Sequence, residues 1–302
     1  MRIIHVIANL SAATGGPPKA VLGMTQGLAR RGHDMSIYTT NYDGDRDGDM
    51  PLDVPVDHDG VSVRTFQVGF PRFWKPSAGL ARALDADVAG TDLVHVHSLY
   101  LHHDLAAWRA CRKHGVPYAV MPHGALDPFI WHRHRWRKRL IEWWYMNRVL
   151  EDAAAIHYTT EDERSLAAPF ARTEKHFIVG NGLDLAEFEA LPPAGAFRAR
   201  YPEIGDRPIV LFHGRLNFKK GLDILAPAFG KVLKAGHDAH LVIAGPDEDM
   251  ADTTRGWLRE AAALERTTFT GMIDGDVRLG AFVDAAMFVL PSYSENFGIA
   301  VA

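Results

Sequence analysis

The chain has 302 residues, more than one average hydrophobic core supports, and this length predicts two domains. Its hydrophobic content of 47% is ordinary for a globular protein, and its net charge of -4 argues against general nucleic-acid binding. Cys111 is the single cysteine, which excludes an internal disulfide and fits a reducing cytosol. The N-terminus turns polar too early for a signal peptide, and no apolar run is long enough to cross a bilayer.

The first part of the chain has the order strand, glycine loop, helix and strand. The apolar pattern predicts a strand over 2–8, a helix over 19–31 and a second strand over 35–40. Gly15 and Gly16 lie in the loop before the helix. This order predicts a βαβ unit. Because the G-x-G-x-x-G fingerprint is absent, a dehydrogenase is disfavoured, and the two glycines also suit a simple tight turn.

An acidic, turn-rich segment follows over 41–60. Its alternating aspartates are Asp43, Asp45, Asp47 and Asp49. They resemble the head of a calcium loop, and Asp45 with Asp47 resembles the D-x-D pair that holds a metal and a nucleotide in another class of enzymes. Val54 stands where the calcium loop requires its bidentate glutamate. We therefore expect a solvated loop and no metal site.

Histidines gather at the end of a later predicted strand. The pattern predicts strands over 61–68 and 93–97, with a short helix over 80–88 between them. The histidines are His95, His97, His102 and His103. Such a cluster can bind zinc, but the cysteine or carboxylate ligands of a typical site are missing. We expect His95 to be structural and His97 to face a cleft near the strand end.

A further histidine directly follows the predicted strand 118–121. His123 stands between Pro122 and Gly124. Ligands of open α/β sheets bind at the carboxyl ends of parallel strands, so His123 is a candidate site residue.

The segment 129–150 is dense in arginine and tryptophan and is predicted to form one helix. Its cations and aromatic residues are Arg133, Arg135, Arg137, Lys138, Arg139, Arg148, Trp131, Trp136, Trp143, Trp144 and Tyr145. At helical spacing, Trp136, Leu140, Trp143 and Leu150 fall near one face. The helix either packs its aromatic side chains inward or uses the cluster from Arg133 to Arg139 to contact an anionic membrane surface or an anionic acceptor.

A break in the pattern at 191–195 separates two predicted domains, 1–190 and 191–302. Strands are predicted over 154–159 and 177–179 before the break. A second α/β series follows it. Its strands are predicted at 209–212, 240–244, 267–270 and 287–290, and its helices at 222–235, 250–264 and 274–284.

The loop after the strand at 209–212 carries cations and glycines at a strand end. Arg215 and Lys220 are flanked by Gly214 and Gly221, and a predicted helix begins directly afterwards. Arginine binds two phosphate oxygens at once, lysine adds a point charge, and a helix N-terminus favours anions. The loop is therefore predicted to grip a diphosphate, although an ordinary exposed basic loop has the same composition.

Other segments also follow strands of this second domain. Met272 and Ile273 lie in one strand-end turn, and Glu295 follows the last strand. The next three residues are Asn296, Phe297 and Gly298. They are predicted to open a helix whose amide groups point at an anion or a sugar hydroxyl.

Taken in order, these segments resemble the GT4-type, or group 1, retaining glycosyltransferases of the GT-B fold. The resemblance implies two Rossmann-like, doubly wound α/β domains that face each other across a cleft, an acceptor-side domain over 1–190 and a nucleotide-sugar-binding domain over 191–302. It covers nearly the whole chain. The matching motifs are Gly15-Gly16, Pro122-His123-Gly124, Asn181-Gly182-Leu183-Asp184, Gly214-Arg215 with Lys219-Lys220-Gly221-Leu222, and Ser292-x-x-Glu295-x-Phe297-Gly298.

The resemblance also implies roles for individual residues. Arg215 and Lys220 would hold the donor diphosphate, and Gly16, beside Gly15, would let the backbone approach it. His123 would contact the donor sugar near the reacting carbon. The remaining donor contacts would come from Glu295, Asn296, Phe297 and Gly298 to the sugar and from Met272 and Ile273 to the base.

The implied reaction moves a hexose from a UDP- or GDP-sugar to a glycan or lipid-linked acceptor in surface polysaccharide synthesis, with retention of anomeric configuration. No divalent metal is implied, because Arg215, Lys220 and helix dipoles supply the positive charge. The implied location is the cytoplasm, or the cytoplasmic face of the cell membrane.

The chain departs from the family pattern at its end. The family's second glutamate, which usually holds the ribose, would follow Ala302. We therefore expect an incomplete C-terminal domain, and weak or no transfer if the chain ends there. Two alternatives stay open. One is a nucleotide-sugar-binding protein without turnover. The other is a GT-B nucleotide-sugar epimerase, which needs a set of carboxylates for elimination that these motifs lack.

Overall fold

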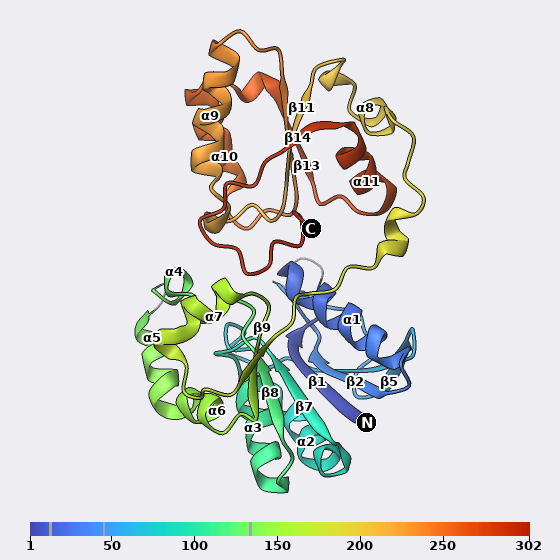
Figure 1. Cartoon of the computed structure of the whole chain (residues 1–302), viewed down its shortest axis with the longest axis vertical. Helices are drawn as coiled ribbons and strands as arrows, with labels where there is room; N and C mark the ends of the chain where they lie inside the picture. Colours follow the sequence, from blue (N-terminus) through green and yellow to red (C-terminus); the bar gives the residue numbers. More distant parts are fainter. Residues whose placement is uncertain (12–13, 45, 133–134) are drawn as a thin grey trace. The chain divides into compact units, whose positions relative to one another are not determined.

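A computed structural model describes residues 1–11, 14–44, 46–132 and 135–302. It divides the chain into two compact units, Met1–Leu183 and Asp184–Ala302 (Figure 1). The division between the units falls before the predicted break at 191–195. The short helix η5 (Leu185–Phe188) lies directly after the division. None of the helices in the described ranges is long and apolar enough to cross a membrane.

The first unit is built on an eight-stranded sheet with the order β10-β9-β8-β7-β1-β2-β6-β5. Neighbouring strands are parallel except β5, which is antiparallel to β6. The order runs outward from β1 in both directions, so the sheet is doubly wound and has its switch point at β1 and β7. The strands are β1 (Arg2–Asn9), β2 (Asp34–Thr40), β5 (Pro55–His58), β6 (Val61–Phe66), β7 (Leu93–His97), β8 (Tyr118–Met121), β9 (Ala155–Tyr158) and β10 (His176–Ile178).

Helices pack against both faces of this sheet. Ile3 and Ile7 of β1 pack with α1 on one face, and Ile4 and Val6 pack with α2 and α3 on the other. This follows from the period of two along a strand, which places His5 on the face of Ile3 and Ile7. The helices named here and below are α1 (Gly16–Ala29), α2 (Ala78–Asp87), α3 (His102–His114) and α7 (Glu161–Ala167).

Helix α1 begins earlier than the sequence pattern predicts. Gly15, with φ 90°, precedes the first helical residue, Gly16, and Pro17 and Pro18 lie within the first turn. Proline fits there because the first amide groups of a helix have no partner within it and φ is already helical. Placing Gly16 to Pro18 in a loop was therefore wrong.

The predicted single helix over 129–150 is also wrong. The described chain there forms α4 (Pro128–Trp131), α5 (Arg135–Ile141), a π-helical turn η3 (Glu142–Met146) and α6 (Asn147–Glu151). A π turn adds a residue per turn and rotates the helix face that follows it. As a result Leu150 is buried, whereas Trp136, Leu140 and Trp143 are 66%, 57% and 82% exposed. They do not form one packed stripe.

The second unit is a three-layered α/β structure. Its four-stranded sheet has the order β13-β12-β11-β14, and all its neighbours are parallel. Helices α9 and α10 cover one face, and α8 and α11 cover the other (Figure 1). The elements are α8 (Ala196–Arg200), β11 (Ile209–His213), α9 (Leu222–Lys234), β12 (His240–Ala244), α10 (Ala251–Glu260), β13 (Thr267–Gly271), α11 (Gly275–Asp284) and β14 (Ala285–Phe288).

Most predicted elements of this unit are present with small changes at their ends. Helix α10 was predicted to reach Leu264 but ends at Glu260. Ala262 has a left-handed φ of 55°, which a right-handed helix does not accommodate. The short helix η8 (Leu264–Arg266) follows it.

Candidate functional site

The carboxyl ends of the four parallel strands of the second unit lie along one edge of its sheet. The loop from Gly214 to Lys220 follows β11, and the loop that begins at Gly245 follows β12. Glu295 lies in the segment after β14. In open α/β sheets this edge is where ligands bind.

Arg215 is held by a carboxylate from the loop after β12. Its Nη1 donates to Glu248 Oε1 at 2.5 Å, and Asn217 Nδ2 donates to Glu248 Oε2 at 2.9 Å. The backbone ties the same loops together, because Leu216 N donates to Pro246 O at 2.9 Å. A guanidinium has five N–H donors, and Glu248 receives one of them. Glu248 was not among the predicted site residues.

Lys220 meets the predicted residue Glu295 directly. Lys220 ends the short helix η7 (Phe218–Lys220), just before α9. Its Nζ donates to Glu295 Oε1 at 2.5 Å, and Ser292 Oγ donates to the same oxygen at 2.6 Å. The Lys220 side chain is only 14% exposed. The two residues are 75 positions apart in the sequence, so the fold brings them together.

Two glycines allow the loops of this edge to pack closely. Gly245 has φ 144°, and a Cβ there would overlap the carbonyl oxygen of Gly214. Gly221 has φ 65°, and a Cβ there would overlap the carbonyl oxygen of Pro291. Each glycine therefore admits a neighbouring backbone at a distance that no other residue allows.

This arrangement suits an anion with more than one charged oxygen. Half-buried Arg215 and Lys220 lie in the loop that joins β11 to α9. At the start of the helix, next to Lys220, the helix dipole adds to the positive potential. Glu248 and Glu295 each orient one cation through a single hydrogen bond. The remaining N–H donors of both cations are the groups that a diphosphate would accept from.

The other predicted site residues of the second unit differ in their exposure and in their local structure. Met272 is 53% exposed, whereas Ile273 is 9% exposed and belongs to the hydrophobic core. No helix begins at 296–298 in the described structure. Gly298 has φ 72°, outside the right-handed helical region, and Val301 N donates to its carbonyl in a turn. The prediction that this segment opens a helix was therefore wrong.

The glycine loop of the first unit leads into α1 at the switch point of the sheet. Gly15 is the N-cap residue of the helix, and as a glycine it has no side chain to accept from the first amide groups. Because Pro17 and Pro18 carry no N–H, this helix start offers fewer amide donors than an ordinary one. The phosphate role of Gly16 stays a prediction.

His123 occupies the turn after β8, in a backbone conformation that a buried carboxylate holds. His123 and Gly124 have φ values of 51° and 76°. Gly124 N donates to Glu163 Oε1 at 2.7 Å, and Thr159 N donates to Glu163 Oε2 at 2.7 Å. Burial raises the pKa of Glu163. Sequence reasoning missed Glu163, because its location in α7 is remote from the turn along the chain.

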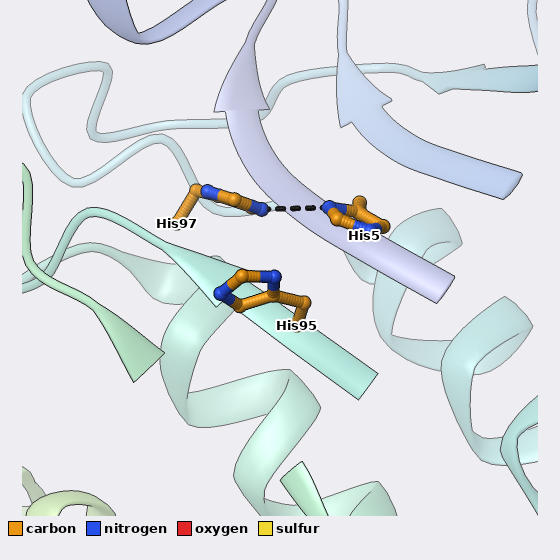
Figure 2. A group of neighbouring side chains, drawn as sticks. All are labelled: His5, His95 and His97. Carbon is orange, nitrogen blue, oxygen red and sulfur yellow. Dashed lines mark hydrogen bonds between the residues drawn. The ribbon is translucent and has the colours of Figure 1, made fainter. Parts of the chain in front are cut away.

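Histidine side chains form a buried cluster on one face of the first sheet. His5 Nδ1 lies 2.8 Å from His97 Nε2 (Figure 2). His97 Nδ1 lies 3.0 Å from His123 Nε2. His95 lies beside them, with its ring centroid 4.4 Å from that of His97. His97 does end its strand, but its side chain is fully buried. The prediction that it faces a cleft was wrong. His103 Nε2 donates to His97 O at 2.7 Å.

One group of three potential metal ligands is found among the described residues. Nitrogens of His5, His95 and His97 all lie within 4.8 Å of one another. The group contains no carboxylate, so the charge of a buried dication would have no compensation within it. His5 and His97 already hydrogen-bond to each other. These features favour a hydrogen-bonded core over a metal site.

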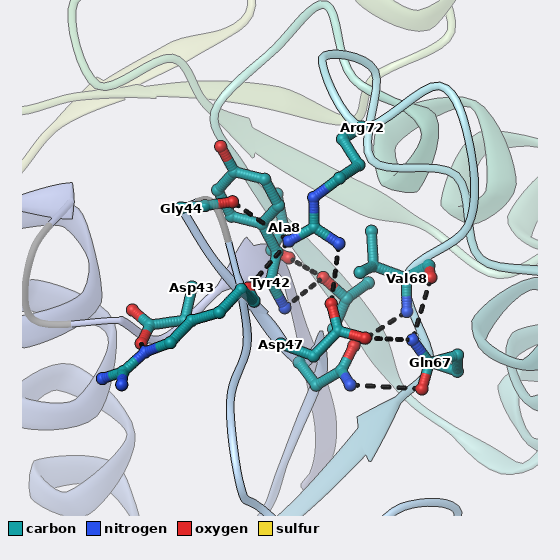
Figure 3. Close-up of polar contacts among 11 residues, drawn as sticks. Ala8, Tyr42, Asp43, Gly44, Asp47, Gln67, Val68 and Arg72 are labelled. Carbon is teal, nitrogen blue, oxygen red and sulfur yellow. Dashed lines mark hydrogen bonds and ion pairs between the residues drawn. The ribbon is translucent and has the colours of Figure 1, made fainter.

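Two carboxylates of the acidic loop, those of Asp43 and Asp47, bind other side chains of the first unit. Arg72 Nη1 donates to Asp47 Oδ1 at 2.7 Å (Figure 3). Ser11 Oγ donates to Asp43 Oδ1 at 2.5 Å. The hydrogen bond from Arg72 lowers the pKa of Asp47. Asp45 lies outside the described residues. The loop forms the hairpin of β3 (Tyr42–Asp43) and β4 (Arg46–Asp47).

The two α/β units with parallel sheets define a protein of the GT-B fold class. A sucrose-phosphate synthase structure from Thermosynechococcus elongatus has a TM-score of 0.77 at 21% identity and covers 99% of this chain and 78% of that one. The structure of HepE from Anabaena in complex with UDP and glucose has a TM-score of 0.76 at 14% identity, and the match covers 100% of this chain and 77% of that one. The predicted fold class is confirmed.

The sequence also matches known families and relatives. Residues 15–182 match the glycosyl transferase 4-like domain, and residues 195–302 match the glycosyl transferases group 1. The chain belongs to the GT4-type, group 1 glycosyltransferases, as its motifs predict. A GDP-mannose:cellobiosyl-diphosphopolyprenol alpha-mannosyltransferase from Xanthomonas oryzae is 24% identical over 99% of this chain and 75% of its own length. An uncharacterised glycosyltransferase from Methanocaldococcus jannaschii is 26% identical over 92% of this chain and 70% of its own length.

Proposed function

We propose that the chain is a retaining hexosyltransferase that uses a nucleoside diphosphate sugar. The observation that supports this most directly is the pair of half-buried cations, Arg215 and Lys220, at the carboxyl end of β11 and the start of α9. A diphosphate is the part of such a donor that is common to all bases and sugars. The pair therefore supports the class of donor and leaves its base and sugar to experiment.

In the proposed reaction the bond between the anomeric carbon and the diphosphate oxygen breaks, and its electron pair leaves with the diphosphate. Arg215 and Lys220 neutralise the charge that develops on that oxygen, which lowers the barrier. The acceptor hydroxyl forms the new bond to the anomeric carbon on the same face and gives its proton to the departing diphosphate oxygen. Glu295, whose Oε1 is used by Lys220 and Ser292, would bind sugar hydroxyls through its other oxygen.

The relatives suggest which donors and acceptors to try. GDP-mannose is the donor in the name of the Xanthomonas relative, and UDP-glucose is bound in a structure of HepE. We propose a UDP- or GDP-hexose as donor and a glycan or polyprenol-linked glycan as acceptor, in the synthesis of surface polysaccharide.

The proposed reaction needs no divalent metal, because cationic side chains supply the charge at the phosphates. Activity should therefore survive excess EDTA without loss. A strict requirement for added magnesium or manganese would contradict this part of the proposal.

The phosphate role is tested by measuring released UDP or GDP with a panel of donors and acceptors. Arg215→Ala and Lys220→Ala should each lower kcat/KM by about 100-fold or more, the size expected when one group that stabilises developing charge is removed. Arg266→Ala is the matched control. Arg266 also pairs with an aspartate, Asp238, but precedes the amino end of β13. Near-normal rates in both site variants would contradict the proposal, and donor binding without turnover would favour a binding protein.

We also propose that the surface of α5 contacts an anionic membrane. Trp136, Leu140 and Trp143 are largely exposed beside the basic residues Arg137 and Arg139. Arg133, the first residue of the predicted cluster, lies outside the described residues. Aromatic side chains next to cations are typical of helices that lie at a lipid interface.

The membrane proposal is tested by sedimentation with phosphatidylglycerol and phosphatidylcholine vesicles. Each basic residue near an anionic surface contributes about 1 kcal/mol, so changing both Arg137 and Arg139 to Gln should weaken binding to the anionic vesicles by about 30-fold. The Arg255→Gln variant of α10 should bind as the unchanged protein does. Equal binding of the double variant would rule the α5 surface out.

A further inference from the structure

Three histidines of the first unit form a continuous hydrogen-bonded chain from the core of the sheet to the turn after β8. His5 Nδ1 pairs with His97 Nε2 at 2.8 Å, and His97 Nδ1 pairs with His123 Nε2 at 3.0 Å. His5 is 1% exposed and His97 is fully buried, whereas His123 is half-buried. Figure 2 shows the inner link of this chain. Both nitrogens of His97 are used, so His123 is the end that a ligand can reach.

Burial keeps this chain neutral at physiological pH. It lowers the pKa of His5 and of His123 to about 3, and it lowers the pKa of His97 well below its usual value. A neutral imidazole carries one N–H and one bare nitrogen. Each of the two hydrogen bonds therefore contains one proton. The three imidazoles can be arranged in only two ways: every hydrogen bond is donated toward His123, or every one is donated toward His5.

His5, at the buried end of the three histidines, shows which of the two arrangements is present. His5 Nε2 is buried and has no hydrogen-bond partner among the residues that the structure describes. If His97 donated to His5, this nitrogen would carry an N–H in the core with nothing to accept it. Orphaned buried N–H groups are rarer in proteins than acceptors that lack a donor. His5 therefore donates through Nδ1 to His97, and His97 donates through Nδ1 to His123.

We propose that His5 and His97 are positioning residues that fix His123 as the Nδ1–H tautomer, so that His123 presents an N–H donor, and not a bare nitrogen, to an oxygen of its ligand. This rests on the proposed function only in identifying that ligand as the donor sugar. The left-handed backbone at His123 and Gly124, held by the hydrogen bond from Gly124 N to Glu163, fixes the direction in which the same imidazole leaves the chain. The ring is thus set in both direction and protonation.

The tautomer is read directly by nitrogen NMR of the full chain labelled with 15N-histidine, without any donor. His123→Gln identifies the signals of His123. The expected result is a protonated Nδ1 and a bare Nε2 at His123. In His97→Leu the hydrogen bond to His123 Nε2 is lost, and His123 should shift toward the Nε2–H form. His97→Gln should restore the Nδ1–H form, because a carboxamide can accept from His5 and donate to His123.

His95→Leu is the matched control. His95 is buried on the same strand but makes no hydrogen bond to this chain, so the tautomer of His123 should not change. An Nε2–H form of His123 in the unchanged protein would overturn the proposal, and so would an unaltered His123 signal in a folded His97→Leu variant.

Activity supplies a second, separate reading. Loss of one positioned hydrogen bond should lower kcat for transfer by about tenfold in His97→Leu, and His97→Gln should recover most of it. If the unchanged protein transfers no sugar from any nucleoside diphosphate donor, the proposed function fails while the NMR result still stands. If transfer occurs but Gln does not rescue it, the positioning role fails.

Discussion

At Gly245 the backbone itself decides which residue is possible. The φ of 144° is one that side chains rarely adopt, and a Cβ there would overlap the carbonyl oxygen of Gly214. The overlap involves backbone atoms on both sides, so rotation of a side chain cannot relieve it. The contact also fixes the backbone directly before Arg215. Gly245 is therefore needed for both the stability and the geometry of the cation site.

Gly245→Ala should lower the free energy of unfolding of the second unit by about 3 kcal/mol, because a strained φ and a backbone overlap each cost about 1–3 kcal/mol. Gly256→Ala is a control from the same unit. It lies within α10, and a Cβ there would meet nothing within 4 Å. This change should stabilise by about 0.5–1 kcal/mol. Urea unfolding of both variants checks the prediction, and equal stability would contradict it.

At the scale of the element, the π turn η3 presents one aromatic residue to the core and another to the surface. Tyr145 is 1% exposed and donates to Leu101 O at 3.0 Å. Trp143, two residues earlier, is 82% exposed. Residues two apart lie about 200° from each other around an α-helix, so Trp143 and Tyr145 fall on opposite faces. The extra residue of the π turn changes the face of the residues that follow it, such as the buried Leu150.

Tyr145→Ala should therefore destabilise the first unit by about 3–5 kcal/mol, the cost of removing a large buried ring. Trp143→Ala should change stability by no more than about 0.5 kcal/mol, as is usual at exposed positions. Denaturant unfolding of the two variants measures the difference. A large loss of stability in Trp143→Ala would show that this ring is packed in solution.

For the whole molecule, the buried histidines predict a dependence of stability on pH. The pKa of a histidine in an unfolded chain is about 6.5, and burial lowers the pKa of His5 to about 3. Below pH 6.5 the unfolded state binds a proton that the folded state does not, so stability falls as the pH drops from about 6.5 toward 3. Above pH 6.5 neither state binds it, and the effect is absent. Asp104 acts in the opposite sense, because burial raises its pKa to about 7.

Since other groups also titrate, the prediction concerns the difference between two proteins. His5→Gln should reduce the slope of unfolding free energy against pH by up to about 1.4 kcal/mol per pH unit between roughly pH 4.5 and 6. Urea titrations across this range measure it, and identical slopes for His5→Gln and the unchanged protein would contradict the burial argument.

The sequence predicted the parallel strands of both sheets and the strand-end position of Arg215, Lys220, His123 and Glu295. It missed β5 (Pro55–His58), which lies in the segment expected to be a solvated loop. The predicted features follow from local patterns, because the period of two along a strand and the residues that end an element are local properties. The errors at 129–150 and 296–298 are local as well. A π turn and a glycine with positive φ are decided by packing, and no periodicity announces them.

By itself, then, the sequence determined where cations and histidines stand along the chain and which edge of each sheet they occupy. Only the tertiary structure decided what they meet there. Glu248 reaches Arg215 across 33 positions, Glu295 reaches Lys220 across 75, and His5 reaches His97 across 92. Such pairings depend on which strands become neighbours and how far each loop extends. Strand neighbours are chosen by burial of the whole core, which no single stretch of sequence contains.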